Sequence, residues 1–258
     1  MSDDPLLSVR NLHKYFGGIT AVDGFDLSVE RNSISGLIGP NGAGKTTVFR
    51  TISGFHEPDE GEVVFDGEEI TGSPIHEVVE AGITRTFQEA RTFPTMTVFE
   101  NLLVGKTNHR GEQLLTATRG RRGYEADERE AIDHADQLLA YMGLEESRDK
   151  RADQLAVGER KLLEIARALM TDPELILLDE PMAGLPADVT ADVVEYIERI
   201  RAERDQTFLV VEHDMDTIMS LCDTLTVMEA GQTIATGTPE EVRNDERVVE
   251  AYLGEEAE

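Results

Sequence analysis

Short apolar runs of strand length alternate with longer amphipathic segments along most of this chain. The runs at 33–38, 175–178 and 207–211 are largely apolar, which is typical of strands buried on both faces of a parallel sheet. Segments 125–142 and 187–203 instead repeat apolar residues at the spacing of one helix face. Strands that alternate with helices in this way predict an α/β fold built on a mainly parallel sheet.

Two stretches depart from this alternation. The N-terminal quarter contains antiparallel strands, including a hairpin over Gly61–Ile70 with Asp-Gly at its turn. The stretch from about 90 to 165 carries almost no strand pattern, which indicates a helical insertion. We therefore expect a single domain over 1–258, in which 1–89 and 166–258 form a core with an antiparallel β subdomain and 90–165 forms a helical subdomain.

The charge of the chain is strongly negative. Its 258 residues include 24 Lys and Arg but 52 Asp and Glu, so the formal net charge is −28. This balance argues against binding of nucleic acid through a basic surface. An acidic surface suits high salt, where ions screen the repulsion among carboxylates, so adaptation to a salty cytosol is one hypothesis. The alternative is an ordinary acidic soluble protein.

The sequence contains no sign of disulfides or of membrane insertion. Cys222 is the only cysteine, so an intrachain disulfide is impossible. The N-terminus is acidic and lacks the apolar region of a signal peptide. No apolar run approaches the roughly 18 residues that a spanning helix requires. We expect a cytoplasmic chain that reaches a membrane only through its partners.

The segment Gly36–Thr47 contains the pattern G-x-x-x-x-G-K-T between a predicted strand and a predicted helix. Its glycines let backbone N–H groups point at phosphate oxygens, and the helix N-terminus adds a favourable dipole. We expect Lys45 to reach the β- and γ-phosphates of a nucleotide and the Thr46 hydroxyl to bind Mg²⁺. The alternative is a strand-to-helix turn without a ligand. The pattern consists of Gly39, Pro40, Asn41, Gly42, Ala43, Gly44, Lys45 and Thr46.

Four further polar residues follow predicted strands, where ligand groups gather in a parallel sheet. Asp179 is suited to hold Mg²⁺, and Glu180 to deprotonate an attacking water. His213 is suited to hydrogen-bond the γ-phosphate or the nucleophile, and Gln88 to contact Mg²⁺ or water. Each residue alone has a structural alternative, but together with the phosphate loop they predict a hydrolytic nucleotide site.

These motifs, in this order, resemble those of the ATP-binding subunits of ABC transporters over essentially the whole chain. The resemblance implies a P-loop NTPase (RecA-like) core, an inserted α-helical subdomain that carries the signature motif, and hydrolysis of ATP with Mg²⁺. The matching segments are Gly39–Thr46 for Walker A, Gln88 for the Q-loop, Leu155-Ala156-Val157-Gly158-Glu159 for the signature, Leu175–Asp179 for Walker B with Glu180 as catalytic glutamate, Pro181–Leu185 for the D-loop and His213 for the switch histidine.

The resemblance also implies a role for each matched residue. Phe16 matches the aromatic residue that stacks on adenine, and Tyr15 is the second choice. The catalytic group comprises Glu180, His213 and Gln88, and the metal group comprises Thr46, Gln88 and Asp179. The nucleotide-binding group comprises Phe16, Gly39, Pro40, Asn41, Gly42, Ala43, Gly44, Lys45, Thr46, Thr47, Leu155, Ala156, Gly158 and Glu159.

Three positions depart from the family pattern. Ala156 replaces the signature serine, Val157 replaces a glycine, and Pro186 replaces the usual D-loop aspartate. The serine hydroxyl would contact the γ-phosphate of ATP on a partner subunit. Gly158 and the helix N-terminus behind it are retained, so backbone donors can still serve this contact.

Within the family, several stretches look like the ATPases of branched-chain amino-acid importers. They are Arg85-Thr86-Phe87-Gln88, Met96-Thr97-Val98 with Glu100-Asn101-Leu102, Val211-Glu212-His213-Asp214-Met215 and Ala251-Tyr252-Leu253-Gly254. The alternatives are a urea or amide importer of the same subfamily and an ABC-type ATPase outside transport. The sequence leaves the transported solute open.

The resemblance implies partners and a location. A second ATP-binding subunit, identical or paralogous, would complete a nucleotide sandwich. Two integral membrane permease subunits would bind the pair at the cytoplasmic face of the cell membrane, and Phe93–Leu103 is where contact with a permease is expected. An extracytoplasmic solute-binding protein would act indirectly through the permeases.

The net charge generates a first prediction. If the acidic surface is an adaptation to salt, the free energy of unfolding should rise between low and molar KCl, because the added ions screen the repulsion among carboxylates. Urea titrations at each KCl concentration measure this free energy. Equal stability across the range would remove the hypothesis.

Overall fold

The structure is a computed structural model, and it describes residues 4–86, 92–105 and 120–253. It divides into two compact units. The first comprises 1–85, 174–183 and 197–258, and the second comprises 86–173 and 184–196. The boundary that we expected between residues 165 and 166 falls inside helix α5 (Val157–Leu169), which belongs wholly to the second unit.

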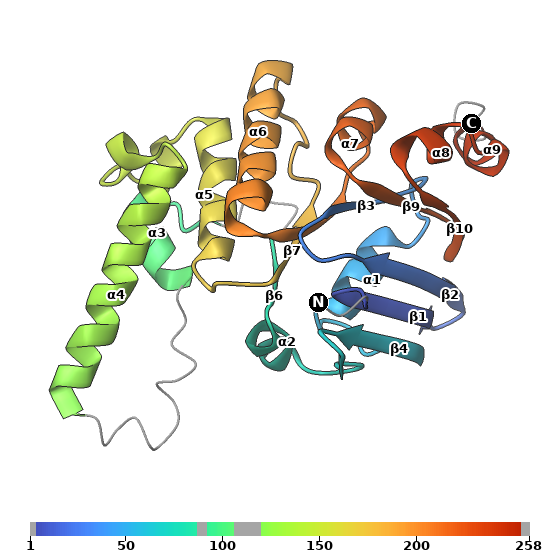
Figure 1. Cartoon of the computed structure of the whole chain (residues 1–258), viewed down its shortest axis with the longest axis horizontal. Helices are drawn as coiled ribbons and strands as arrows, with labels where there is room; N and C mark the ends of the chain where they lie inside the picture. The colour runs from blue at the N-terminus through green and yellow to red at the C-terminus, as the bar shows by residue number, and fades with distance from the viewer. Residues whose placement is uncertain (1–3, 87–91, 106–119, 254–258) are drawn as a thin grey trace. The chain divides into compact units, whose positions relative to one another are not determined.

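The first unit contains a six-stranded sheet in the order β10-β9-β3-β8-β7-β6 (Figure 1). Strands β9, β3, β8, β7 and β6 are parallel, and β10 is antiparallel at the edge. The strands are β3 (Ile34–Ile38), β6 (Ile83–Arg85), β7 (Leu175–Asp179), β8 (Thr207–Val211), β9 (Thr224–Glu229) and β10 (Gln232–Gly237). Every residue of β3, β7 and β8 is buried, which agrees with the apolar runs that predicted them.

The same unit contains an antiparallel sheet of four strands in the order β2-β1-β4-β5. They are β1 (Leu7–Phe16), β2 (Ile19–Val29), β4 (Glu60–Phe65) and β5 (Glu68–Glu69). The expected hairpin joins β4 and β5 through Asp66 and Gly67, whose φ angles of 49° and 78° are those of a type I′ turn. The expected mainly parallel sheet with an antiparallel β subdomain is thus confirmed.

Helix α1 (Lys45–Ile52) lies in the hydrophobic core that the two sheets share. Its apolar side chains Val48, Phe49 and Ile52 are at most 1% exposed. They belong to one cluster with residues of both sheets, including Leu12 of β1 and Leu209 of β8. Burial against both sheets therefore fixes the helix that follows the glycine-rich loop.

The remaining helices of the first unit follow strands or close the chain. They are α2 (Ile75–Ala81), α7 (Met215–Leu221), α8 (Pro239–Arg243) and α9 (Glu246–Leu253). The second unit is helical, with α3 (Val98–Gly105), α4 (Gly120–Tyr141), α5 and two short 3-10 helices, Glu145–Ser147 and Ala152–Gln154. Helix α6 (Ala187–Arg204) begins in the second unit and ends in the first.

Two local expectations differ from the structure. The sequence pattern at 6–12 predicts a first strand that ends near Leu12, but β1 continues to Phe16, because it pairs with β2 up to Phe16 opposite Ile19. The Ser73-Pro74 pair likewise predicts a serine N-cap for α2, with Pro74 as the first helical residue. Pro74 is itself the N-cap in an extended conformation, and the Ser73 N–H donates to Ile70 in the preceding turn.

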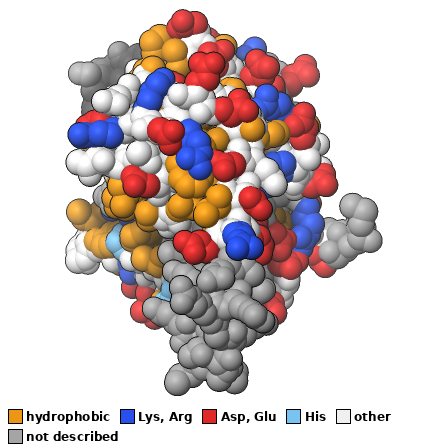
Figure 2. All heavy atoms as spheres, turned by 90° about the vertical axis from the view of Figure 1, so that its left-hand side faces the viewer, with side chains coloured by type: hydrophobic (Ala, Val, Ile, Leu, Met, Phe, Trp, Pro, Cys, Tyr) orange, Lys and Arg blue, Asp and Glu red, His pale blue; other side chains and the backbone are white. Residues whose placement is uncertain are grey.

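The surface reflects the composition. Asp and Glu side chains are spread over the face in Figure 2, among Lys, Arg and small groups of apolar side chains. In the described portion of the chain, no helix combines the length and apolar character needed to cross a membrane.

Candidate functional site

The carboxyl ends of three neighbouring parallel strands lie at one level of the six-stranded sheet. Leu37 in β3 and Asp179 in β7 are both register partners of Val211 in β8. Because neighbouring strands lie about 4.8 Å apart, the segments that follow these residues begin beside one another. These segments are 39–46, 180–183 and 212–214, and they carry most of the polar residues that the sequence predicted for the site.

The loop after β3 requires glycine at two close approaches. A Cβ at Gly39 would lie 2.0 Å from the backbone oxygen of Met228 in β9. A Cβ at Gly44 would lie 2.4 Å from the backbone oxygen of Ala21. Both contacts involve backbone atoms that a side chain cannot displace, and both glycines have positive φ, 151° and 111°. The glycine spacing of the motif is therefore needed to seat the loop between β9 and β2.

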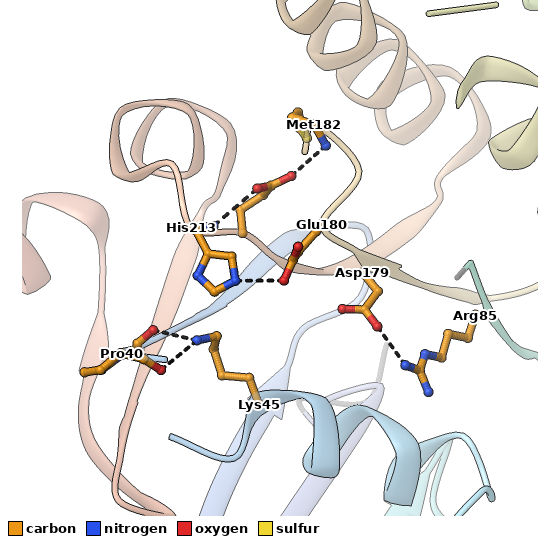
Figure 3. A network of polar contacts seen from close by, with 9 residues as sticks. Pro40, Lys45, Arg85, Asp179, Glu180, Met182 and His213 are labelled. Atoms are coloured by element: carbon orange, nitrogen blue, oxygen red, sulfur yellow. Dashed lines mark hydrogen bonds and ion pairs between the residues drawn. The ribbon is translucent and has the colours of Figure 1, made fainter. Parts of the chain in front are cut away.

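Lys45 begins α1 and is only 5% exposed. Its Nζ donates to the backbone oxygens of Gly39 at 2.6 Å and Pro40 at 3.0 Å, so the side chain crosses back over its own loop (Figure 3). Gly44 caps the helix without a side-chain hydrogen bond, so backbone N–H groups of the first turn remain directed at the loop. Thr46 and Thr47 follow in that turn and are partly buried. Such a helix start attracts anions.

Glu180 and His213 lie in contact at the ends of β7 and β8. The Glu180 Oε1 and the His213 Nε2 are 2.7 Å apart, and the Glu180 N–H donates to the Val211 carbonyl at 2.9 Å (Figure 3). Glu180 has φ 49°, a left-handed conformation that costs a non-glycine residue about 1 kcal/mol or more. Strain at a residue with a carboxylate at a strand end is typical of a functional position.

Asp179 forms a buried ion pair that the sequence analysis did not predict. Its Oδ2 accepts a hydrogen bond from Arg85 Nη2 at 2.7 Å, and the two side chains are 2% and 8% exposed (Figure 3). The Arg85 guanidinium also lies over the rings of Phe49 and Phe55, at 6.0 and 5.7 Å from their centroids. The signal in the sequence for this ion pair was an arginine at the end of one predicted strand and an aspartate at the end of another.

Glu212 is a second buried charge that the sequence analysis did not assign. It directly follows β8 and is 4% exposed. Burial raises the pKa of its carboxyl above the usual value; hydrogen bonds from the backbone N–H groups of Met182 and His213 oppose this rise. Its position between a strand end and His213 was visible in the sequence.

The signature segment lies in the second unit, at the start of α5. Ala156 is the N-cap, and its N–H donates to Glu159 Oε2 at 2.9 Å, while the Ser147 hydroxyl donates to Glu159 Oε1 at 2.7 Å. Partial burial opposes ionisation of Glu159, but these two hydrogen bonds and the charge of Lys150 lower its pKa overall. Glu159 thus supplies one half of a capping box, by accepting the N-cap N–H. A hydroxyl at position 156 would supply the other half.

The neighbours of that N-cap differ in exposure. Leu155 is 4% exposed, whereas Val157 is 44% exposed. A Cβ at Gly158 would lie 2.6 Å from the Val189 Cγ1, so this position has no room for a larger residue. The signature segment therefore exposes Ala156 and Val157 at the helix start.

The aromatic pair at the end of β1 is exposed. Phe16 is 41% exposed, with the His56 ring edge-on at 5.2 Å and the Lys14 Nζ 5.5 Å from its centroid. Tyr15 is engaged by its hydroxyl, 3.1 Å from the His13 Nδ1.

The residues expected to bind Mg²⁺ are described only in part by the structure. Gln88 lies outside the described residues. Over residues 4–86, 92–105 and 120–253, no three His, Cys, Asp or Glu side chains gather as a metal cluster. Of the expected metal ligands, Thr46 and Asp179 lie within the described residues, and Asp179 is paired with Arg85.

A mainly parallel sheet whose β3 strand leads through this glycine-rich loop into α1 is the fold of a P-loop NTPase of the RecA-like type. The chain belongs to the ABC transporter family of ATP-binding proteins, since the family model described as ABC transporter matches residues 22–183. A model described as branched-chain amino acid ATP-binding cassette transporter matches residues 232–258. The resemblance inferred from the motifs is confirmed, together with the ATPase class that it implies.

Individual proteins support this membership. The chain is 43% identical to the high-affinity branched-chain amino acid transport ATP-binding protein BraF of Pseudomonas aeruginosa, over 97% of this chain and 98% of that protein. It is 41% identical to LivG of Escherichia coli, which carries the same description, over the same shares. A crystal structure of a nucleotide-free ATP-binding cassette from an ABC transporter is 38% identical, with TM-score 0.84, and covers 96% of this chain and 98% of that one.

The Arg85–Asp179 pair generates a stability prediction. Arg85→Met leaves the buried Asp179 carboxylate without its counter-ion, so the free energy of unfolding should fall by about 3–5 kcal/mol. Urea denaturation of the full chain measures this change. Arg31→Met is the matched control, because Arg31 is 42% exposed at its side chain and pairs with the exposed Asp66 and Glu174. Equal effects of the two substitutions would contradict the assigned importance of burial.

Proposed function

We propose that this chain is the ATP-hydrolysing subunit of an ABC importer for branched-chain amino acids. The alignment of the Leu37, Val211 and Asp179 strand ends carries the hydrolytic part, because it brings the phosphate loop beside Glu180 and His213. The solute is proposed from the relatives BraF and LivG and from the family model that matches 232–258.

ATP would be held by the loop Gly39–Thr47. Backbone N–H groups of the loop and of the first turn of α1 would donate to phosphate oxygens. Lys45 would exchange the carbonyls of Gly39 and Pro40 for the β- and γ-phosphates. Phe16 would stack on the adenine.

Mg²⁺ would be held by the Thr46 hydroxyl and the Asp179 carboxylate, with Gln88 as a further oxygen donor. When bound, the ion neutralises negative charge on the phosphates. Arg85 contacts Asp179 at 2.7 Å and fixes the orientation of this carboxylate from the side of β6.

Glu180 would accept a proton from the attacking water. His213, 2.7 Å away, would hold the Glu180 carboxylate in place and contact the γ-phosphate. The support for these roles is their geometry: two titratable side chains in contact, at adjacent strand ends, beside a phosphate loop.

A second ATP-binding subunit would complete the site. Its segment Leu155, Ala156, Gly158 and Glu159 would face the nucleotide held by the first subunit, with backbone donors at the start of α5 in place of the serine hydroxyl.

Two permease subunits would bind near Phe93, which is 41% exposed. The Asn101 side chain supports this loop, because it donates to the Phe93 carbonyl and accepts from the Phe93 N–H. Closure of the pair would be transmitted to the permeases at the cytoplasmic face of the membrane.

Two substitutions separate binding from chemistry. Glu180→Gln should retain ATP binding and lower kcat by about 100- to 10,000-fold, the usual contribution of a general base. Lys45→Ala should weaken ATP binding, because it removes the cation directed at the phosphates. Binding of a fluorescent ATP analogue and phosphate release measure the two effects, and Glu229→Gln, at an exposed carboxylate, is the control. Retained steady-state hydrolysis by Glu180→Gln would refute its assignment as base, and unchanged affinity in Lys45→Ala would refute the phosphate site.

Identifying the transported solute requires the assembled transporter. In proteoliposomes that contain this chain and its permeases, leucine, isoleucine or valine with the cognate solute-binding protein should raise ATP turnover, because solute delivery favours closure of the ATPase pair. The measurement is phosphate release with and without each solute. Stimulation by urea or an amide alone would move the chain to the other importers of the subfamily. Failure to assemble with any membrane protein would place it outside transport.

A further inference from the structure

Glu212 joins two segments that carry the proposed catalytic pair. Its Oε1 accepts the Met182 N–H at 2.6 Å, and its Oε2 accepts the His213 N–H at 3.2 Å. Met182 lies two residues after Glu180, in the turn that follows β7, and Figure 3 shows it beside the His213 end of β8. One buried carboxylate therefore bridges the two strand ends.

Backbone hydrogen bonds hold the two ends of the turn that bears Glu180. Glu180 is held by its N–H bond to Val211, and the Ala183 N–H closes the turn on the Glu180 carbonyl at 3.2 Å. Between these contacts, the chain passes through the left-handed conformation of Glu180. The bond from Met182 to Glu212 ties the middle of the turn to the residue that follows β8.

Burial makes this arrangement costly. Glu212 is 4% exposed, and within the described residues it forms no ion pair with Lys or Arg. A buried carboxylate without a counter-ion costs several kcal/mol unless hydrogen bonds compensate. Here both oxygens are engaged by backbone N–H groups, so the carboxylate is held in one orientation and is poorly placed to take a proton from water.

We propose that Glu212 is a positioning residue for ATP hydrolysis: its carboxylate clamps the turn at Met182 to the end of β8 and thereby sets the 2.7 Å contact between Glu180 and His213. This inference rests on the proposed hydrolytic function of the same site. Glu212 touches neither ATP nor water in this role and acts through the backbone of its two neighbours.

The test uses Glu212→Ala and Glu212→Gln in the full-length chain, assembled with its partner subunits for the kcat measurement. Displacing a catalytic group by about 1 Å can cost 100-fold in rate, so Glu212→Ala should lower kcat by about that factor. The affinity for a fluorescent ATP analogue should stay within about twofold, because the phosphate loop belongs to β3 and α1. Glu212→Gln should lose less, because its carboxamide oxygen can still accept the Met182 N–H. Glu229→Gln again serves as the exposed control.

A second measurement tests the hydrogen bond between the Met182 N–H and Glu212 independently of catalysis. Hydrogen exchange at the Met182 amide, measured without nucleotide, should accelerate in Glu212→Ala and less in Glu212→Gln. Unchanged kcat and unchanged exchange in the folded variants would overturn the proposal. A parallel loss of kcat and ATP affinity would also overturn it, since that result indicates general damage.

Two outcomes separate this proposal from others. If Glu212→Gln lowers kcat as far as Glu180→Gln, Glu212 is itself a base and the positioning role is wrong. If the assembled transporter with the wild-type chain hydrolyses no ATP, the proposed function fails, while faster exchange at Met182 would still show that the clamp exists.

Discussion

The common level of three parallel strand ends is the constraint on which the site depends. Hydrogen-bonded register places Leu37, Val211 and Asp179 side by side, so a loop for phosphates and a pair of titratable residues need no long-range adjustment to meet. Every residue of β3, β7 and β8 is buried, so the hydrophobic core holds these strands on both faces. Core packing and chemistry are thus parts of one arrangement.

Charges placed around this edge are buried at a cost to folding. Arg85 and Asp179 form a nearly inaccessible pair, and Glu212 is held by backbone N–H groups. Replacing such groups by apolar residues of similar volume often stabilises proteins, so their presence is better explained by orientation of neighbouring groups than by stability. The left-handed Glu180 adds strain at the same edge. Two buried charged groups and one left-handed residue therefore lie together where β7 and β8 end.

Much of the fold and site could be predicted from the sequence, and the misses have physical causes. The runs at 175–178 and 207–211 predicted buried strands, because both their apolar composition and their length are those of a buried strand. The glycine motif predicted a loop in which Gly39 and Gly44 have positive φ and lie close to other backbone atoms. Arg85 and Glu212 were missed because their roles depend on partners 94 and 30 residues away, which pairing of strands brings close. The end of β1 at Phe16 was missed because pairing with β2, rather than local preference, sets its length.

The fold of Lys45 onto its own loop has a consequence for recognition. Its ammonium already spans the carbonyls of Gly39 and Pro40, and the loop backbone is wedged against Met228 and Ala21. A loop braced in this manner forfeits little conformational entropy when it takes up an anion. A bound anion must replace the two peptide carbonyls as hydrogen-bond acceptor of the Lys45 ammonium. The loop therefore selects ligands whose oxygens are more basic than peptide carbonyls.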